Sequence, residues 1–212
     1  MQPTTISATT TRDIYGDFHD TQEIALHVEQ QSKLTYVCRL HQQADITLDL
    51  TAAWTGAEIH CHVLVVAHQT STPKLRLQGI LAADETTIHV RIVTLLWEQG
   101  KADVDGGIVI KPDIIKASGH LLEENVLLGE KVQLHVIPKL DVHSNDVSAS
   151  HGAKIHRLDP HKLFYLHAKW LDHETAKKTM LEGTIRDLLA PLEDDNQKEQ
   201  RVQETLHQLL QA

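Results

Sequence analysis

Three histidines occupy positions where the sequence could support chemistry. His151 is flanked by the small residues Ser150 and Gly152, just before an extended stretch gives way to a helical one. His60 and His62 alternate around Cys61, so an extended backbone would place both imidazoles on one face. Near neutral pH an imidazole can bind iron or carry a proton. The sequence therefore contains two separate candidate sites.

The His60–His62 pair leads to one functional hypothesis, a histidine-rich β-fold metalloenzyme that adds a third ligand. A cupin-type metal site would carry a glutamate shortly after the pair, but Val65, Val66 and Ala67 occupy that region. A solvated strand face is therefore the favoured interpretation of the pair. The same interpretation applies to His89 and His135, which lie in similar alternating runs. The two cysteines, Cys38 and Cys61, sit inside apolar runs and are interpreted as packed thiols.

The surrounding elements are mostly strands. Apolar and polar residues alternate over short runs separated by turn signals, such as Trp54-Thr55-Gly56 and Asp105-Gly106-Gly107. Aromatic residues make up only 4% of the chain, which favours a core of stacked aliphatic side chains, as in a β-solenoid. A sandwich or barrel would satisfy the same alternation. The runs cover residues 24–28, 34–40, 46–50, 59–65, 75–81, 88–92 and 132–136.

The apolar period changes at Asp159-Pro160, which predicts the start of a helix. Asp172 is expected to cap a second helix that ends near Pro191. A last helix over 197–212 carries a narrow apolar stripe that should dock on the β-region or on a partner. We therefore expect three segments: a mobile tail over 1–22, a β-core over 23–158 and a helical segment over 159–212.

Composition excludes several functional classes. The chain has 212 residues and a net charge of −9, which argues against a basic nucleic-acid-binding face. No apolar run reaches a membrane-spanning length, and no secretory signal is evident, so a cytoplasmic location is expected. There is no phosphate-binding G-x-x-x-x-G-K-[ST] motif, so the chain should bind no nucleotide. G-x-S-x-G and C-x-x-C motifs are also absent.

The segment from Leu121 to Gly183 resembles a known family. It contains P-x-L-x-V, then Asn-Asp-Val-x-x-Ser-His-Gly-Ala, then Leu-Asp and Leu-Phe-Tyr-Leu. This pattern is similar to the C-terminal core of the SufB/SufD family, whose members are scaffold subunits of SUF iron–sulfur cluster assembly. The chain looks like a short SufD-like homologue. The matching positions are Pro138, Leu140, Val142, Asn145, Asp146, Val147, Ser150, His151, Gly152, Ala153, Leu158, Asp159, Leu163, Phe164, Tyr165 and Leu166.

The resemblance implies a right-handed parallel β-helix followed by a small helical segment, acting as a non-catalytic scaffold. His151 would take part in cluster assembly and contact iron or a transient cluster. A second SufB/SufD-type subunit, identical or distinct, would pair through Val147, Ser150, His151 and Gly152. A SufC-type ABC ATPase would bind any nucleotide and dock on the C-terminal helices. The docking residues would be Leu163, Phe164, Tyr165, Leu166, Trp170 and Met180.

The chain departs from the family at two positions that matter for cluster ligation. Many SufD-type members have cysteine where this chain has Ala149, and SufB-type members tend to have cysteine where it has Leu166. Thiolates are the usual ligands of iron–sulfur clusters. Their absence puts ligation by this chain alone in doubt.

Overall fold

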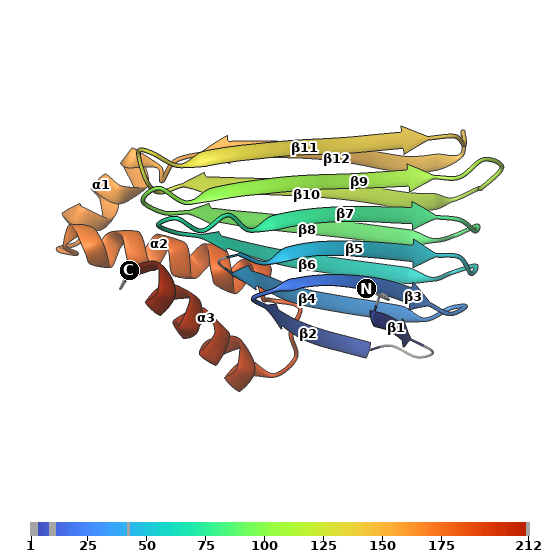
Figure 1. The fold of residues 1–212 in the computed structure, drawn as a ribbon, viewed down its shortest axis with the longest axis horizontal. Helices are drawn as coiled ribbons and strands as arrows, with labels where there is room; N and C mark the ends of the chain where they lie inside the picture. Colours follow the sequence, from blue (N-terminus) through green and yellow to red (C-terminus); the bar gives the residue numbers. More distant parts are fainter. Residues whose placement is uncertain (1–3, 9–11, 42, 211–212) are drawn as a thin grey trace.

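Two parallel sheets of six strands lie face to face and form a β-helix (Figure 1). The structure, a computed structural model, describes residues 4–8, 12–41 and 43–210. One sheet contains the odd-numbered strands: β1 (Thr4–Ala8), β3 (Thr21–Val28), β5 (Asp45–Ala52), β7 (Lys74–Leu81), β9 (Lys101–Ile110) and β11 (Gln133–Val142). The other contains the even-numbered strands: β2 (Arg12–Phe18), β4 (Lys33–His41), β6 (Glu58–Ala67), β8 (Thr87–Leu96), β10 (Ala117–Leu127) and β12 (Val147–His156).

One coil of the solenoid contains one strand of each sheet. Each strand pairs in parallel with the strand of the same sheet in the preceding coil, so successive strands alternate between the two sheets. The coils lengthen on the way. Thr4 pairs with Ile24, a step of 20 residues, whereas Val104 pairs with Val136, a step of 32. A changing step explains why the sequence shows no strict repeat. The predicted mainly β solenoid followed by helices is confirmed.

The core between the sheets is a stack of aliphatic side chains. Leu34, Ile59 and Ile88 occupy one register position in successive coils and are fully buried. Burying such a side chain contributes about 1.5–3 kcal/mol to stability. Cys38 and Cys61 are also fully buried in this core, so the prediction of packed thiols is confirmed. Tyr36 is the one aromatic among the largest fully buried side chains of the described residues, which fits the low aromatic content.

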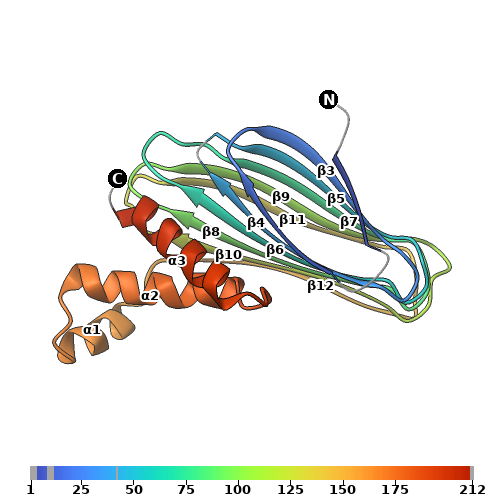
Figure 2. The same cartoon turned by 90° about the horizontal axis from the view of Figure 1, so that it is seen from below.

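The even sheet is covered on its outer face as well. The chain ends in α1 (Pro160–Ala168), α2 (His173–Leu188) and α3 (Asp195–Leu210), and Figure 2 shows α2 and α3 beside this sheet. The expectation that the stripe of the last helix docks on the β-region is confirmed. None of the helices in the described ranges is long and apolar enough to cross a membrane. A second hydrophobic core lies between the outer face of the even sheet and the helices. Its sheet residues are Val37, Leu64, Val66, Val93 and Leu95, and its helix residues are Leu181, Ile185, Leu188, Val202, Leu206 and Leu209.

Two sequence expectations are wrong. Strands were expected only from about residue 24, but β1 and β2 already pair with β3 and β4, because Ile6 and Ile14 pack against the core. The expected mobility of the 1–22 segment stays a prediction, and residues 1–3 and 9–11 of it lie outside the described residues, as do 211–212 of the last helix. The turn expected at Asp105-Gly106-Gly107 is instead the middle of β9, which pairs with β7 and β11.

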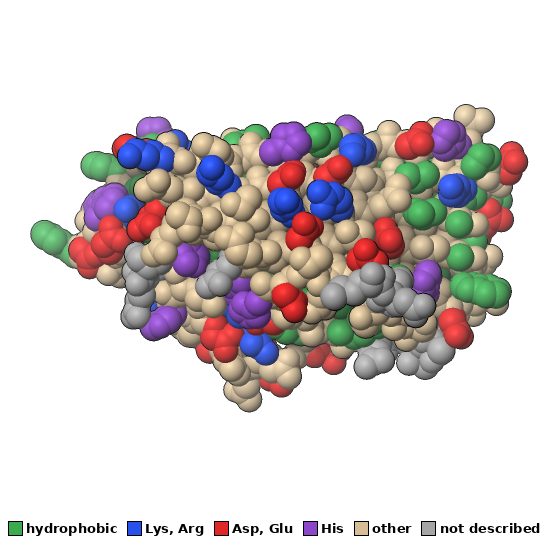
Figure 3. Space-filling model, in the orientation of Figure 1, with side chains coloured by type: hydrophobic (Ala, Val, Ile, Leu, Met, Phe, Trp, Pro, Cys, Tyr) green, Lys and Arg blue, Asp and Glu red, His purple; other side chains and the backbone are tan. Residues whose placement is uncertain are grey.

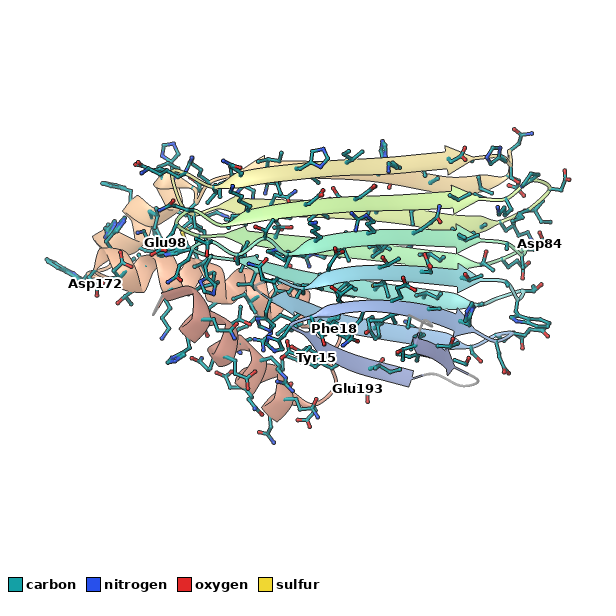
Figure 4. The ribbon with its side chains drawn as sticks, viewed as in Figure 1. Tyr15, Phe18, Asp84, Glu98, Asp172 and Glu193 are labelled. Atoms are coloured by element: carbon teal, nitrogen blue, oxygen red, sulfur yellow. The ribbon has the colours of Figure 1, made fainter. Side chains whose placement is uncertain are left out.

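The odd sheet is open to solvent. Figure 3 shows acidic and basic side chains mixed over this face. They pair across strands: Arg76 Nη1 lies 3.0 Å from Asp45 Oδ1, and Lys139 Nζ lies 2.7 Å from Asp105 Oδ2. Such exposed pairs contribute little to stability. Figure 4 shows Asp84 in a turn at one end of the solenoid and Asp172 at the opposite, helical end.

A buried arginine fastens α3 to the sheet. Arg39 on β4 is 3% exposed, and its guanidinium donates to Asp17 Oδ2 at 2.7 Å and to Thr205 Oγ1 at 2.7 Å. It also donates to Glu204 Oε2 at 3.2 Å. Burial acts to raise the pKa of Asp17, but hydrogen bonds from His41 and Arg39 outweigh it and hold this pKa well below its usual range.

We expect Arg39→Ala to lower the free energy of unfolding by about 3 kcal/mol, because it leaves a partly buried carboxylate without its partner. Arg76→Ala is the matched control, since its ion pair lies in solvent and its loss should cost less than about 1 kcal/mol. Urea denaturation measures the free energy of unfolding of the wild type and of both variants. Equal losses in the two variants would contradict the anchoring role of Arg39.

Candidate functional site

The histidines that the sequence assigned to separate sites line one groove. It has a volume of about 470 Å³ and lies on the outer face of the even sheet. His60 and His62 come from β6, and His151 comes from β12 with its neighbours Ser150 and Gly152. Strands β8 and β10 lie between them and contribute His89, Arg91 and His120, together with Val90, Leu121 and Leu122.

A ladder of three imidazoles runs across this groove. His60, His89 and His120 are register partners on β6, β8 and β10, and Ser150 on β12 is the next partner. The ring centroids of His60 and His89 are 5.2 Å apart, and those of His89 and His120 are 5.0 Å apart. Both pairs meet edge to face. A hydrogen bond of 2.6 Å joins His120 Nδ1 to Ser150 Oγ. We call His60, His89 and His120 the histidine ladder.

Burial and nearby charges lower the pKa of two rings of the ladder, His60 and His89. Burial, with the nearby Lys33 ammonium, lowers the pKa of His60. Partial burial lowers the pKa of His89, and its two neighbours, His60 and His120, lower it further because adjacent imidazolium ions would repel one another. The lowered pKa favours the neutral imidazole in His60 and His89, in which one ring nitrogen keeps its lone pair.

His62 does not join His60 in a closed metal site. Its register partner is Arg91, next to the end of α2, and burial lowers the pKa of His62 to about 4. Its Nδ1 is buried without a hydrogen-bond partner. Within the described ranges, the one set of three metal-type side chains whose donor atoms all lie within 4.8 Å is Asp17, His19 and His41. The third ligand that a metalloenzyme would need beside His60 and His62 is therefore not supplied.

His151 lies on the terminal coil. Its register partner is Leu121, which faces the core, so His151 belongs to the inward-facing set of β12. No strand of the described chain pairs with the far edge of β12 or of β11, and the imidazole is exposed. The proposed interface residues Val147, Ser150, His151 and Gly152 therefore share one open strand. Apolar side chains remain uncovered on these two strands, namely Ile137, Val142 and Ile155.

The predicted ATPase-docking residues lie on a helical hairpin at the end of the solenoid. Helix α1 buries none of its residues, and Figure 2 shows it projecting beyond the sheets. Phe164 is 74% exposed, Tyr165 62% and Trp170 96%, while Leu163, Leu166 and Met180 are half-buried. Tyr165, Leu166 and Met180 line a cavity of about 1050 Å³ between the hairpin and the ends of β10 and β12.

Glu123 is a buried acid that sequence reasoning missed. It is 0% exposed on β10 and faces the core, and neither carboxylate oxygen has a hydrogen-bond partner. Burial, with the charge of Asp105, raises the pKa of Glu123 to about 7. Gly106 makes room for it, since a Cβ there would lie 2.5 Å from Glu123 Oε1. The sequence could have indicated it, because Glu123 follows Leu121 by two residues and so falls on the apolar, core-facing side of the strand.

The fold and these surfaces define a two-sheet β-solenoid with an uncovered terminal coil and an exposed helical hairpin. Residues 5–184 match the family model described as "SUF system FeS cluster assembly, SufBD core domain". The chain therefore belongs to the SufBD family.

Curated relatives agree with this family. The chain is 28% identical over 107 residues to the iron–sulfur cluster assembly protein SufD of Escherichia coli K12, covering 50% of this chain and 25% of that protein. It is 24% identical over 166 residues to protein ABCI7, chloroplastic, of Arabidopsis thaliana, covering 70% and 34%. It is 29% identical over 87 residues to SufD of Bacillus subtilis 168, covering 41% and 20%. The chain thus spans a fifth to a third of their length.

We expect Glu123→Gln to change how stability depends on pH. A carboxyl whose pKa rises on folding binds more protons in the folded state, so the wild type loses stability as pH increases from about 4.5 to about 7. This loss, at most about 3 kcal/mol, is absent in the variant. Urea denaturation across this pH range measures it.

The control is Glu85→Gln, which changes an exposed glutamate in a turn. It should reproduce the pH profile of the wild type. Parallel profiles for the wild type and Glu123→Gln would show that Glu123 does not titrate abnormally.

Proposed function

We propose that the chain is a non-catalytic scaffold subunit of a SUF-type iron–sulfur cluster assembly complex. The observation that carries the proposal is the match to the SufBD core over residues 5–184, on a solenoid whose last coil is uncovered. The names of relatives from Escherichia coli and Bacillus subtilis state iron–sulfur cluster assembly. Two surfaces of this chain support the same role.

The first surface is the free edge of β12. A parallel strand without an outer neighbour presents unpaired backbone N–H and C=O groups, which favour pairing with a strand from another chain. Ile137, Val142 and Ile155 add apolar surface on the same coil. We infer that a second SufB/SufD-type subunit, either a copy of this chain or a distinct one, continues the solenoid here.

This arrangement places His151 at a subunit interface, where its imidazole would contact iron or a transient cluster as cargo. The chain has two cysteines, and both thiols lie in the core, where burial raises the pKa of Cys38 and Cys61. No thiolate of this chain therefore reaches the edge. Any thiolate ligands of the cluster would come from a partner, in keeping with Ala149 and Leu166 where relatives have cysteine.

The second surface is the hairpin of α1 and α2. Phe164, Tyr165 and Trp170 are large, exposed aromatic side chains on this hairpin, and aromatic side chains often dominate protein interfaces. We infer that a SufC-type ABC ATPase docks on this hairpin and supplies the ATP hydrolysis. The chain itself has no phosphate-binding loop.

We expect Trp170→Ala to weaken binding of the cognate SufC-type ATPase by at least about tenfold, because it removes a large, almost fully exposed indole from the interface. Trp54→Ala is the matched control. Trp54 is 57% exposed but lies in the turn between β5 and β6, at the end of the solenoid away from the helices (Figure 1). Size-exclusion co-elution and calorimetry measure both variants. Absence of complex formation by the wild type would overturn the proposed function.

We expect His151→Ala to preserve pairing with the SufB/SufD-type partner but to lower the iron retained after anaerobic reconstitution, because the imidazole is an iron donor at the interface. His143→Ala is the control, since His143 is an exposed histidine in the turn next to β12 and pairs with Asp141. Iron content and visible absorption of the purified complex are the readouts. Iron retention equal to wild type in His151→Ala would rule out the role assigned to it.

A further inference from the structure

We propose that the histidine ladder is a second metal site, which holds a divalent first-row transition ion between pairs of imidazoles from neighbouring strands. His89 is shared by both pairs. The site is distinct from His151 on the terminal coil, and its existence does not depend on the proposed function.

The geometry suits pairwise chelation. Register partners on adjacent parallel strands are roughly 4.8 Å apart, and the ring centroids of His60–His89 and His89–His120 are separated by 5.2 Å and 5.0 Å. An ion that binds two imidazoles at about 2.0–2.1 Å fits between rings at this spacing after small side-chain rotations. His60 and His120 are two strand spacings apart, roughly 10 Å, so one ion cannot engage all three rings.

Each ion would therefore bind His89 and one neighbour. Its remaining coordination positions would face the groove and be filled by water or another donor. Two protein ligands bind a metal ion more weakly than the three or four of a permanent metal site. The ladder is therefore suited to reversible metal binding. Imidazole donors favour Fe²⁺, Co²⁺, Ni²⁺, Cu²⁺ and Zn²⁺ over Mg²⁺ or Ca²⁺.

A carboxylate lies at one end of the ladder, with an ammonium group beside it. Glu58 Oε2 lies 3.6 Å from His60 Nε2 and adds a carboxylate at one end, although Lys33 is also 3.9 Å from that carboxylate. The guanidinium of Arg91, which lines the same groove, lies 2.6 Å from Asp187 and 3.7 Å from Glu124.

The cluster of Asp17, His19 and His41 is tighter but fits a cation less well. Arg39 Nη2 already lies 2.7 Å from Asp17 Oδ2, and His41 Nε2 lies 2.5 Å from Asp17 Oδ1. Arg201 Nη1 lies 3.6 Å from the same carboxylate. Two guanidinium groups neutralise the acid and repel a further positive charge. The ladder, with no cationic side chain in contact with His89 or His120 among the described contacts, is the better metal site.

The ladder leads toward the terminal coil. His120 bonds to Ser150, the residue before His151, so an ion between His89 and His120 would lie in the same groove as the open strand. If the proposed function holds, and this step rests on it, the ladder would keep ferrous iron close to the terminal strand that carries His151.

Titration of the full-length, metal-free protein with Zn²⁺ and Co²⁺, followed by calorimetry and by cobalt absorption, tests the site. We expect saturable binding by the wild type and at least a tenfold weaker affinity in His89→Ala, which breaks both pairs. His60→Ala and His120→Ala each keep one pair and should lose less affinity. His89→Gln, checked by circular dichroism, replaces His89→Ala if that variant does not fold.

Two further variants locate the ion. His135→Ala is the matched control: His135 is an exposed histidine on the odd sheet, bonded to Asp103, and its loss should leave the affinity unchanged. Binding that persists in His151→Ala but weakens in His89→Ala places the ion at the ladder even if cluster assembly fails. Absence of saturable binding, wild-type affinity in His89→Ala, or loss of binding in His151→Ala alone would overturn the proposal.

Discussion

The parallel register between coils is the constraint on which the rest of this structure depends. Each residue stacks on its counterpart one coil earlier, about 4.8 Å away, so side chains of one kind form continuous rows through the protein. Rows of Leu, Ile and Val build the core, whereas polar rows stay outside. The same stacking generates the histidine ladder. It also brings diagonal neighbours, two residues off the register, close enough for the Arg76–Asp45 and Lys139–Asp105 ion pairs.

In a solenoid the first and last coils each lack a neighbouring coil on one side, and in the described chain these are the coils of β1 and β2 and of β11 and β12. The protein covers part of its outer surface with α2 and α3, and Arg39 fastens the latter to the sheet. It leaves the edges of β11 and β12 open and α1 without any buried residue. These uncovered regions lie at the terminal coil and at the helical end.

The distribution of thiols and imidazoles gives the chain an unusual chemistry for a family associated with iron–sulfur clusters. Both cysteines are packed in the core, while histidines line the outer groove. Imidazole binds divalent iron without the sulfur chemistry of a thiolate. The scaffold role proposed above therefore assigns any sulfur ligands to a partner.

The sequence by itself determined much of this protein. Alternating aliphatic runs and scarce aromatics predicted the solenoid, Asp159-Pro160 predicted the helical segment, and the Ser-His-Gly-Ala pattern around His151 indicated the family. These are local signals, carried by residues close together in the chain. The missed first coil had too few apolar residues for such a signal, and glycines in β9 gave a false turn signal.

Only the tertiary structure decided which distant residues meet. His60, His89 and His120 are separated by 29 and 31 residues, and the coil step varies along the chain, so no sequence period indicates their contact. Glu123 is buried because Gly106, on the opposite sheet, has no side chain to occupy that space. Strand register and facing-sheet contacts join positions far apart in sequence, and their energies depend on the stacked coils as a whole.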